Sequence, residues 1–196
     1  MKVSLYELIS IIVLVSALLA TISIVYASWK NGISPMPSSL RVREVVVKEI
    51  NRLGDKGVIV EAGSGWGTLG IHIGKQCGGW RIIGIENSSV PLWFSKIWSW
   101  ITFRRFQRVE QNRKTSVTFR RGNIYNYTYE DTSLVICYLY PGAMKQLSAI
   151  LREKLPPSAR VISACFALPE WQPEKVITCT DIYRTQVYIY RVGDNV

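Results

Sequence analysis

Two carboxylates flank a glycine-rich segment between residues 57 and 87. Glu61 stands directly before the residues Ala-Gly-Ser-Gly-Trp-Gly of positions 62–67, and Glu86 ends the next apolar run. Positions 65–70, Gly-Trp-Gly-Thr-Leu-Gly, also satisfy GxGxxG, the dinucleotide pattern in which an acidic residue about 20 positions further on binds a ribose. The segment therefore predicts a nucleotide-type ligand, whose class depends on the charges around it.

Glu61 distinguishes two classes of ligand. A pyrophosphate at a helix start needs backbone N–H groups and positive potential, so a carboxylate beside it is repulsive. S-adenosylmethionine has no phosphate and carries a sulfonium and an ammonium, both of which a nearby carboxylate attracts. We therefore expect the glycine segment to bind this sulfonium cofactor rather than NAD.

The elements that position these carboxylates alternate between helices and strands, which predicts an α/β fold with a mostly parallel sheet covered on both faces. In such sheets ligands lie beyond the carboxyl ends of the strands. The last two strands are joined too tightly for a helix, so we expect an antiparallel hairpin at the sheet edge. The expected helices are 38–53, 67–77, 88–108 and 141–154, and the expected strands are 58–61, 80–86, 116–120, 133–140, 160–166, 175–181 and 185–192.

The N-terminal region contains twenty uncharged residues from Leu8 to Ala27. About 20 apolar residues are needed to cross a membrane as a helix, so we expect an anchor at 1–28, a linker at 29–37 and the main domain at 38–196. A cleaved signal peptide is the alternative, although this stretch exceeds the roughly 7–15 apolar residues usual for one. The basic residues after the span place the domain in the cytoplasm, or on the matrix side in an organelle.

The formal net charge of +10 is concentrated between residues 91 and 121, and basic residues alternate with aromatic ones from Trp93 to Lys114. This mixture suits a helix that lies against anionic lipid headgroups. The same composition also suits RNA, and the aromatic side chains fit equally well as packing against the sheet. The four cysteines show no metal-ligand spacing and His72 has no partner at such a spacing, so we expect no metal site and a reducing compartment.

The string from Glu61 to Gly67 resembles the acidic-x-Gly-x-Gly-x-Gly motif of class I S-adenosylmethionine-dependent methyltransferases, in which case Gly70 completes GxGxxG only by chance. The apolar N-terminal segment, the Pro-Ser linker and the motifs "GIENSSVPLWFSKIWSW", "YLYPGAM" and "FALPEWQPEKV" are similar to the small membrane-anchored protein-lysine methyltransferases. That family includes mitochondrial enzymes that act on the adenine nucleotide carrier and on the ATP synthase c-ring protein. The resemblance covers nearly the whole chain.

The resemblance implies a Rossmann-like class I methyltransferase sheet, S-adenosyl-L-methionine as cofactor and no metal. It places the acceptor near Tyr138, Tyr140 and Pro141, although Tyr138 also fits a core tyrosine. Asn123 would contact adenine, or serve as a turn asparagine. The implied cofactor-binding residues are Glu61, Ala62, Gly63, Ser64, Gly65, Gly67, Glu86, Asn87, Asn123 and Ile124.

These features together predict methylation of a lysine in a membrane or membrane-bound protein. The reaction would be an in-line displacement, in which the enzyme holds a neutral amine close to the methyl carbon. A methyltransferase for RNA, or for a lipid or other small molecule, is the first alternative. A non-catalytic nucleotide-binding membrane adaptor, possibly NAD-linked, is the alternative of another class.

Overall fold

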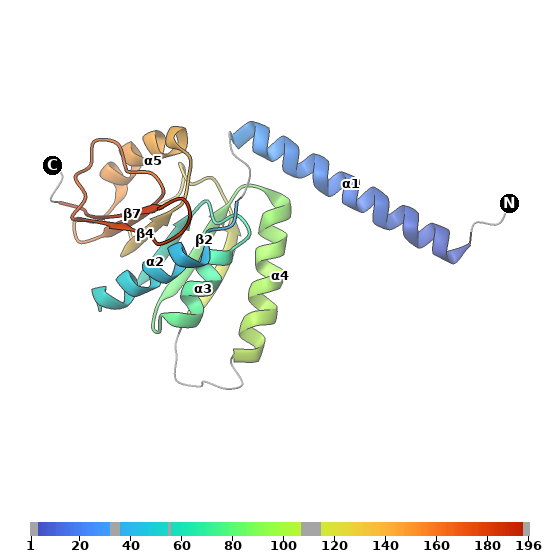
Figure 1. The fold of residues 1–196 in the computed structure, drawn as a ribbon, viewed down its shortest axis with the longest axis horizontal. Helices are drawn as coiled ribbons and strands as arrows, with labels where there is room; N and C mark the ends of the chain where they lie inside the picture. The colour runs from blue at the N-terminus through green and yellow to red at the C-terminus, as the bar shows by residue number, and fades with distance from the viewer. Residues whose placement is uncertain (1–3, 32–35, 55, 107–114, 194–196) are drawn as a thin grey trace.

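The computed structural model describes residues 4–31, 36–54, 56–106 and 115–193. Its centre is a seven-stranded sheet in the order β3-β2-β1-β4-β5-β7-β6 (Figure 1). β7 pairs antiparallel with both β5 and β6, and the other strand pairs are parallel, so the predicted mostly parallel sheet with a terminal hairpin is confirmed. The strands are β1 (Val58–Ala62), β2 (Arg81–Glu86), β3 (Ser116–Arg121), β4 (Leu134–Cys137), β5 (Arg160–Ala164), β6 (Lys175–Thr178) and β7 (Gln186–Arg191).

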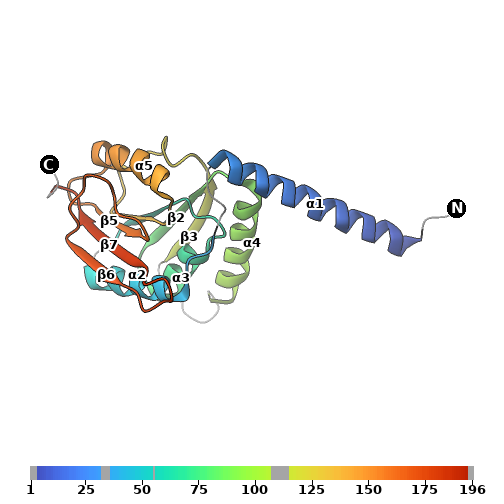
Figure 2. The ribbon, with the colours of Figure 1, turned by 45° about the horizontal axis from the view of Figure 1, so that its top comes forward.

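Helices cover both faces of the sheet, as the alternating pattern predicted. The helices α2 (Leu40–Leu53), α3 (Thr68–Gln76) and α4 (Ser89–Phe106) pack on one face, and α5 (Pro141–Lys154) packs on the other (Figure 2). The connection from β3 to β4 contains no helix. Tyr129 from this connection is fully buried on the α5 face, where a helix would otherwise lie.

The side chains of β1 alternate between these two faces. Val58, Val60 and Ala62 belong to the core beneath α5, whereas Ile59 belongs to the core beneath α2 and α3. Because strand side chains repeat every two residues, Glu61 points to the same face as Ile59. The strand thus directs a carboxyl group into the interior, toward the start of α3.

Three strands end at least two residues earlier than the sequence suggested, namely β4, β5 and β6, and the first two of these border the carboxyl edge of the parallel strands. β4 ends at Cys137, which pairs with Ala62 at the end of β1, and beyond this point the strand has no partner on that side. β5 ends at Ala164 because Cys165 has a φ of 75°, which is not strand geometry. The residues after both strands are therefore free to form the edge where a ligand would lie.

The helix α1 (Leu5–Asn31) projects away from the domain, and its principal contact is with α4 (Figures 1 and 2). Its segment Leu5–Tyr26, with a mean hydropathy of 2.8, is long and apolar enough to cross a membrane and is not buried against the domain. The helix continues to Asn31, so the predicted linker 29–37 begins inside it. In the sequence a helix-breaking glycine follows at position 32.

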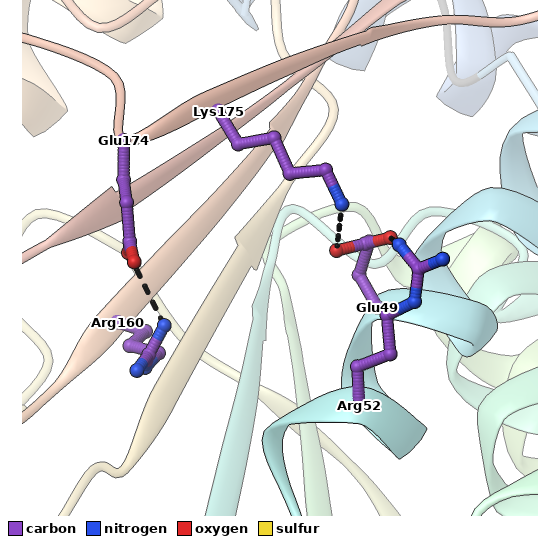
Figure 3. A network of polar contacts seen from close by, with 5 residues as sticks. All are labelled: Glu49, Arg52, Arg160, Glu174 and Lys175. Carbon is purple, nitrogen blue, oxygen red and sulfur yellow. Dashed lines mark hydrogen bonds and ion pairs between the residues drawn. The ribbon is translucent and has the colours of Figure 1, made fainter.

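The helix α2 has the limits that its capping residues predicted. The Ser39 Oγ accepts a hydrogen bond from the Val42 backbone N–H at 3.3 Å, and Gly54 closes the helix with a φ of 64°. On the inner side of α2, the buried Glu49 carboxylate pairs with Arg52 at 2.5 Å and with Lys175 at 2.9 Å (Figure 3). The pair with Lys175 joins α2 to β6 at the far edge of the sheet, and the pair with Arg52 lies within α2.

Candidate functional site

A cavity of about 490 Å³ opens at the carboxyl edge of the parallel strands. Ligand pockets in proteins commonly measure roughly 300–1,000 Å³. The turns that follow β1 to β5 supply most of its walls. Among the described residues that line it, two are acidic, Glu61 and Glu86, and none is basic. The cavity is therefore acidic in a chain of net charge +10.

Three glycines turn the chain from β1 into α3. Gly63, Gly65 and Gly67 have φ values of 75°, 50° and 74°, a region that side chains with a Cβ rarely adopt. The N–H groups of Gly63 and Ser64 both donate to the Ile85 carbonyl at 3.0 Å, which holds the turn against β2. The backbone geometry thus accounts for the Gly-x-Gly-x-Gly spacing.

The Glu86 carboxylate lies at the rim of this turn. Its Oε2 accepts a hydrogen bond from the Gly65 N–H at 2.7 Å, and its Oε1 accepts one from the Ser88 N–H at 2.8 Å. Two backbone groups therefore fix the carboxylate at the end of β2. Because each carboxylate oxygen can accept more than one hydrogen bond, Glu86 can still accept from the hydroxyls of a ligand.

The Glu61 carboxyl is buried beneath the first turn of α3. It is 5 % exposed, and its Oε2 has no hydrogen-bond partner. The pKa of Glu61 is raised to about 8, chiefly by burial; a hydrogen bond from the Gly70 backbone N–H opposes this rise, and the nearby Glu86 adds a smaller rise. The free N–H groups of a helix start, which in other proteins bind phosphate, here face a carboxyl group.

Gly70 explains the literal GxGxxG match. A Cβ at this position would lie 2.5 Å from the Glu61 Oε2 and 3.4 Å from the Phe119 ring. The glycine therefore leaves room for the Glu61 carboxyl instead of for a pyrophosphate.

Unpartnered buried polar atoms gather at this cavity. Among the described residues, the buried side-chain atoms without a hydrogen-bond partner belong to Ser38, Glu61, Ser64 and Trp171, and the first three of these residues line the cavity. A buried polar atom without a partner costs about 1–3 kcal/mol. A polar ligand in the cavity would remove this cost.

Three tyrosines line the cavity, namely Tyr125, Tyr138 and Tyr140. Burial raises the pKa of Tyr138, with smaller contributions from Cys165 and Asp181, and burial also raises the pKa of Tyr125. The hydroxyls of Tyr125 and Tyr138 therefore stay protonated at neutral pH. A Cβ at Gly142 would lie 2.7 Å from the Tyr140 ring, so this glycine lets the ring lie against the start of α5.

Most of the predicted site residues meet at the cavity. Asn123 lines it, and its Oδ1 accepts a hydrogen bond from the Tyr125 N–H at 3.0 Å, so it is also a turn asparagine. Ala62, Gly67 and Pro141 do not line it, since Ala62 lies in the core, Gly67 packs against Phe119 and Pro141 begins α5. The predicted residues that line it are Glu61, Gly63, Ser64, Gly65, Glu86, Asn87, Asn123, Ile124, Tyr138 and Tyr140.

Several lining residues were not predicted from the sequence. Trp66 lies within the glycine segment 62–67, and Tyr125 lies two residues after the predicted adenine contact Asn123. Both could therefore have been predicted as lining residues from their positions in the sequence. The sequence places Ser38 only at the start of the expected helix 38–53, and nothing local indicates that Cys165 would leave β5 in a left-handed conformation. The unpredicted lining residues include Met36, Pro37, Ser38, Trp66, Tyr125, Gln146, Cys165 and Phe166.

The helix α4 buries only part of its apolar surface, since Leu92 packs in the core whereas most of its other large apolar residues are exposed. Its buried face carries small polar residues, including Ser95 and Ser99, whereas its outer face exposes large apolar ones. The ring of Trp66, in the glycine turn, contacts Phe94 edge-on with 5.4 Å between centroids, so this face reaches the cavity. Residues 107–114 and the Arg105 side chain of the predicted basic and aromatic segment lie outside the described residues. The exposed apolar residues of α4 are Trp93, Phe94, Ile97, Trp98, Trp100 and Ile101.

A comparison with known protein families finds one whose model matches the part of the chain that contains most of this site. The family model of the ANTKMT methyltransferase domain matches residues 61–175, more than half of the 196-residue chain. The chain belongs to this family. The match begins at Glu61 and includes both carboxylates, Asn123 and the three tyrosines. The methyltransferase resemblance found in the sequence is thus confirmed.

Individual relatives agree with this assignment. The mouse adenine nucleotide translocase lysine N-methyltransferase is 28% identical over 124 residues, which cover 63% of this chain and 50% of the relative. A protein-lysine N-methyltransferase of Saccharolobus islandicus (strain REY15A) is 24% identical over 153 residues, which cover 75% of this chain and 86% of the relative. The chain thus spans only about half the length of the mouse relative.

Solved structures agree on the fold. An RNA methyltransferase from Salinibacter ruber, in complex with S-adenosyl-L-homocysteine, matches with a TM-score of 0.65 and 23% identity over 82% of this chain and 96% of that one. At this identity the match shows that the domain has the class I methyltransferase fold.

The buried Glu61 predicts a specific pH dependence of stability. Its pKa is about 8 in the folded protein and near 4.5 when exposed, so the folded state retains a proton that the unfolded chain loses between these values. Stability should therefore fall as pH rises from about 4.5 to about 8, by roughly 1.4 kcal/mol for each unit of pKa difference at most. Glu61→Gln should lose this decline, as measured by urea unfolding of the full chain in detergent between pH 5 and 9.

The matched control for this experiment is Glu44→Gln, which changes an exposed carboxylate on α2. This variant should keep the pH dependence of the wild type. An equal decline in the wild type and in Glu61→Gln would show that Glu61 does not hold the proton.

Proposed function

We propose that this protein is an S-adenosylmethionine-dependent protein-lysine N-methyltransferase that acts on a membrane or membrane-associated protein. The observation that carries the proposal is the acidic cavity, in which Glu61 and Glu86 flank the glycine turn and none of the described lining residues is basic. A cationic nucleoside ligand suits this charge, and a dinucleotide does not. The names of the relatives, which are lysine N-methyltransferases, support the choice of acceptor.

The residues of the cavity fit this cofactor. Glu61 would face its sulfonium and ammonium groups, whose positive charge would favour the ionised carboxylate despite its burial. Glu86, already fixed by two backbone N–H groups, would accept hydrogen bonds from the ribose hydroxyls. Ser64 offers a buried hydroxyl that has no partner within the described part of the chain. Asn123 and Ile124 would contact the adenine.

The tyrosines would bind and orient the acceptor amine. When bound, the cofactor supplies an electrophilic methyl group on a sulfonium. Tyr138 and Tyr140 would receive the lysine ammonium on their ring faces, and their partly buried surroundings would favour the neutral amine that attacks. Because burial raises the pKa of Tyr138, its hydroxyl would orient the amine by hydrogen bonding without removing its proton as a base.

The membrane location rests on two features of the chain. The first is α1, which is long enough to span a bilayer. The second is the outer face of α4, where Trp93 is 67% exposed and Trp100 is 59% exposed. The Arg104 guanidinium lies 4.5 Å from the Trp100 ring centroid, an arrangement that suits an interface with anionic headgroups. We propose a single-pass protein with its catalytic domain in the cytoplasm, or on the matrix side in an organelle.

Methyl transfer tests the proposed activity. The full chain in lipid nanodiscs, incubated with methyl-labelled S-adenosylmethionine and membranes of the source organism, should label a protein, and amino-acid analysis should recover methyllysine. Glu86→Gln removes one of the two carboxyl groups of the cavity and should reduce the labelling at least tenfold. Glu44→Gln serves as the control and should label like the wild type. Label in RNA or lipid with none in lysine would contradict the proposed acceptor.

Lipid contact by α4 has its own test. In nanodiscs that contain brominated lipids, the tryptophans near the acyl chains lose fluorescence by collision with bromine. Replacing Trp93, Trp98 and Trp100 together by phenylalanine should remove a large part of the quenchable signal, whereas Trp80→Phe, at a buried position, should remove almost none. An unchanged quenchable signal in the triple variant would place this face away from the lipid.

A further inference from the structure

Two consecutive serines at the start of the domain have different surroundings. Ser39 is exposed and caps α2, with its Oγ accepting a hydrogen bond from the Val42 N–H. Ser38 is only 6% exposed, and its Oγ has no hydrogen-bond partner. A buried hydroxyl without a partner is unfavourable for folding, so the position of Ser38 is not explained by the stability of the domain.

Ser38 lines the acidic cavity together with Met36 and Pro37. The other lining residues with unpartnered buried atoms are Glu61, near the end of β1, and Ser64, in the glycine turn, and both lie inside the residues that the family model matches. Ser38 comes from the segment before α2 and lies outside the matched residues 61–175. Rotation about its χ1 bond gives a serine hydroxyl several directions in which to donate or accept.

We propose that Ser38 is a further cofactor-binding residue, whose hydroxyl forms a hydrogen bond with a polar atom of the bound cofactor. This inference rests on the proposed function. It implies that residues 36–38, directly before α2, complete the cofactor cavity. The same short stretch of chain would then join the membrane anchor and bind the cofactor.

The test compares Ser38→Ala with Ser39→Ala in the full chain in detergent micelles. Calorimetric titration with S-adenosylhomocysteine measures the affinity, and urea unfolding without ligand measures the stability. Ser38→Ala should weaken binding about fivefold to tenfold, the effect of one lost hydrogen bond, and should leave the urea midpoint unchanged or slightly higher. Ser39→Ala should lower the urea midpoint through the lost cap and should leave the affinity unchanged.

Two results would overturn the role of Ser38. One is an unchanged affinity in Ser38→Ala, and the other is a lower urea midpoint in the ligand-free variant, which would show that the hydroxyl has a structural partner. If the wild type itself fails to bind S-adenosylhomocysteine, the proposed function fails instead, so the two failures are distinguishable.

Discussion

The burial of the Glu61 carboxyl beneath the start of α3 is the constraint on which the site depends. The alternation of β1 directs this side chain to the face that α3 covers, and Gly70 lets the helix approach because it has no Cβ. The cost of burying the carboxyl appears as its pKa of about 8. A bound cation would offset that cost, whereas a phosphate would add to it. The buried carboxyl therefore favours a positively charged ligand over a negatively charged one.

The other residues of the cavity also favour a positively charged ligand. Glu86 is held by two backbone N–H groups at the end of β2, next to β1. The glycine turn that follows β1 also lines the cavity. In the sheet, β2 and β4 lie on opposite sides of β1. Because β4 ends early, Tyr138 and Tyr140 follow it at the sheet edge and line the cavity across from Glu86, which ends β2. Aromatic rings and carboxylates thus surround a space that suits positively charged groups, which both the sulfonium and the acceptor ammonium carry.

The sequence predicted the features that depend on local patterns. The strand and helix order, the terminal hairpin and the carboxylates at the glycine turn each follow from residue types at short spacings. Features that depend on strand pairing were less predictable. The early end of β4 follows from the length of β1, and the strand had been expected to continue to Tyr140. The roles of Gly70 and Ser38 arise from packing between segments that are distant in the sequence, so the sequence alone indicated a chance GxGxxG match and placed Ser38 only at the start of a helix.

The central claim is that the Glu61 and Glu86 cavity binds a cationic nucleoside and not a dinucleotide. Calorimetric titration of the full chain in detergent micelles with S-adenosylmethionine and, separately, with NADH tests it most directly. We expect saturable binding of S-adenosylmethionine and no measurable binding of NADH. Saturable binding of NADH without binding of S-adenosylmethionine would contradict it.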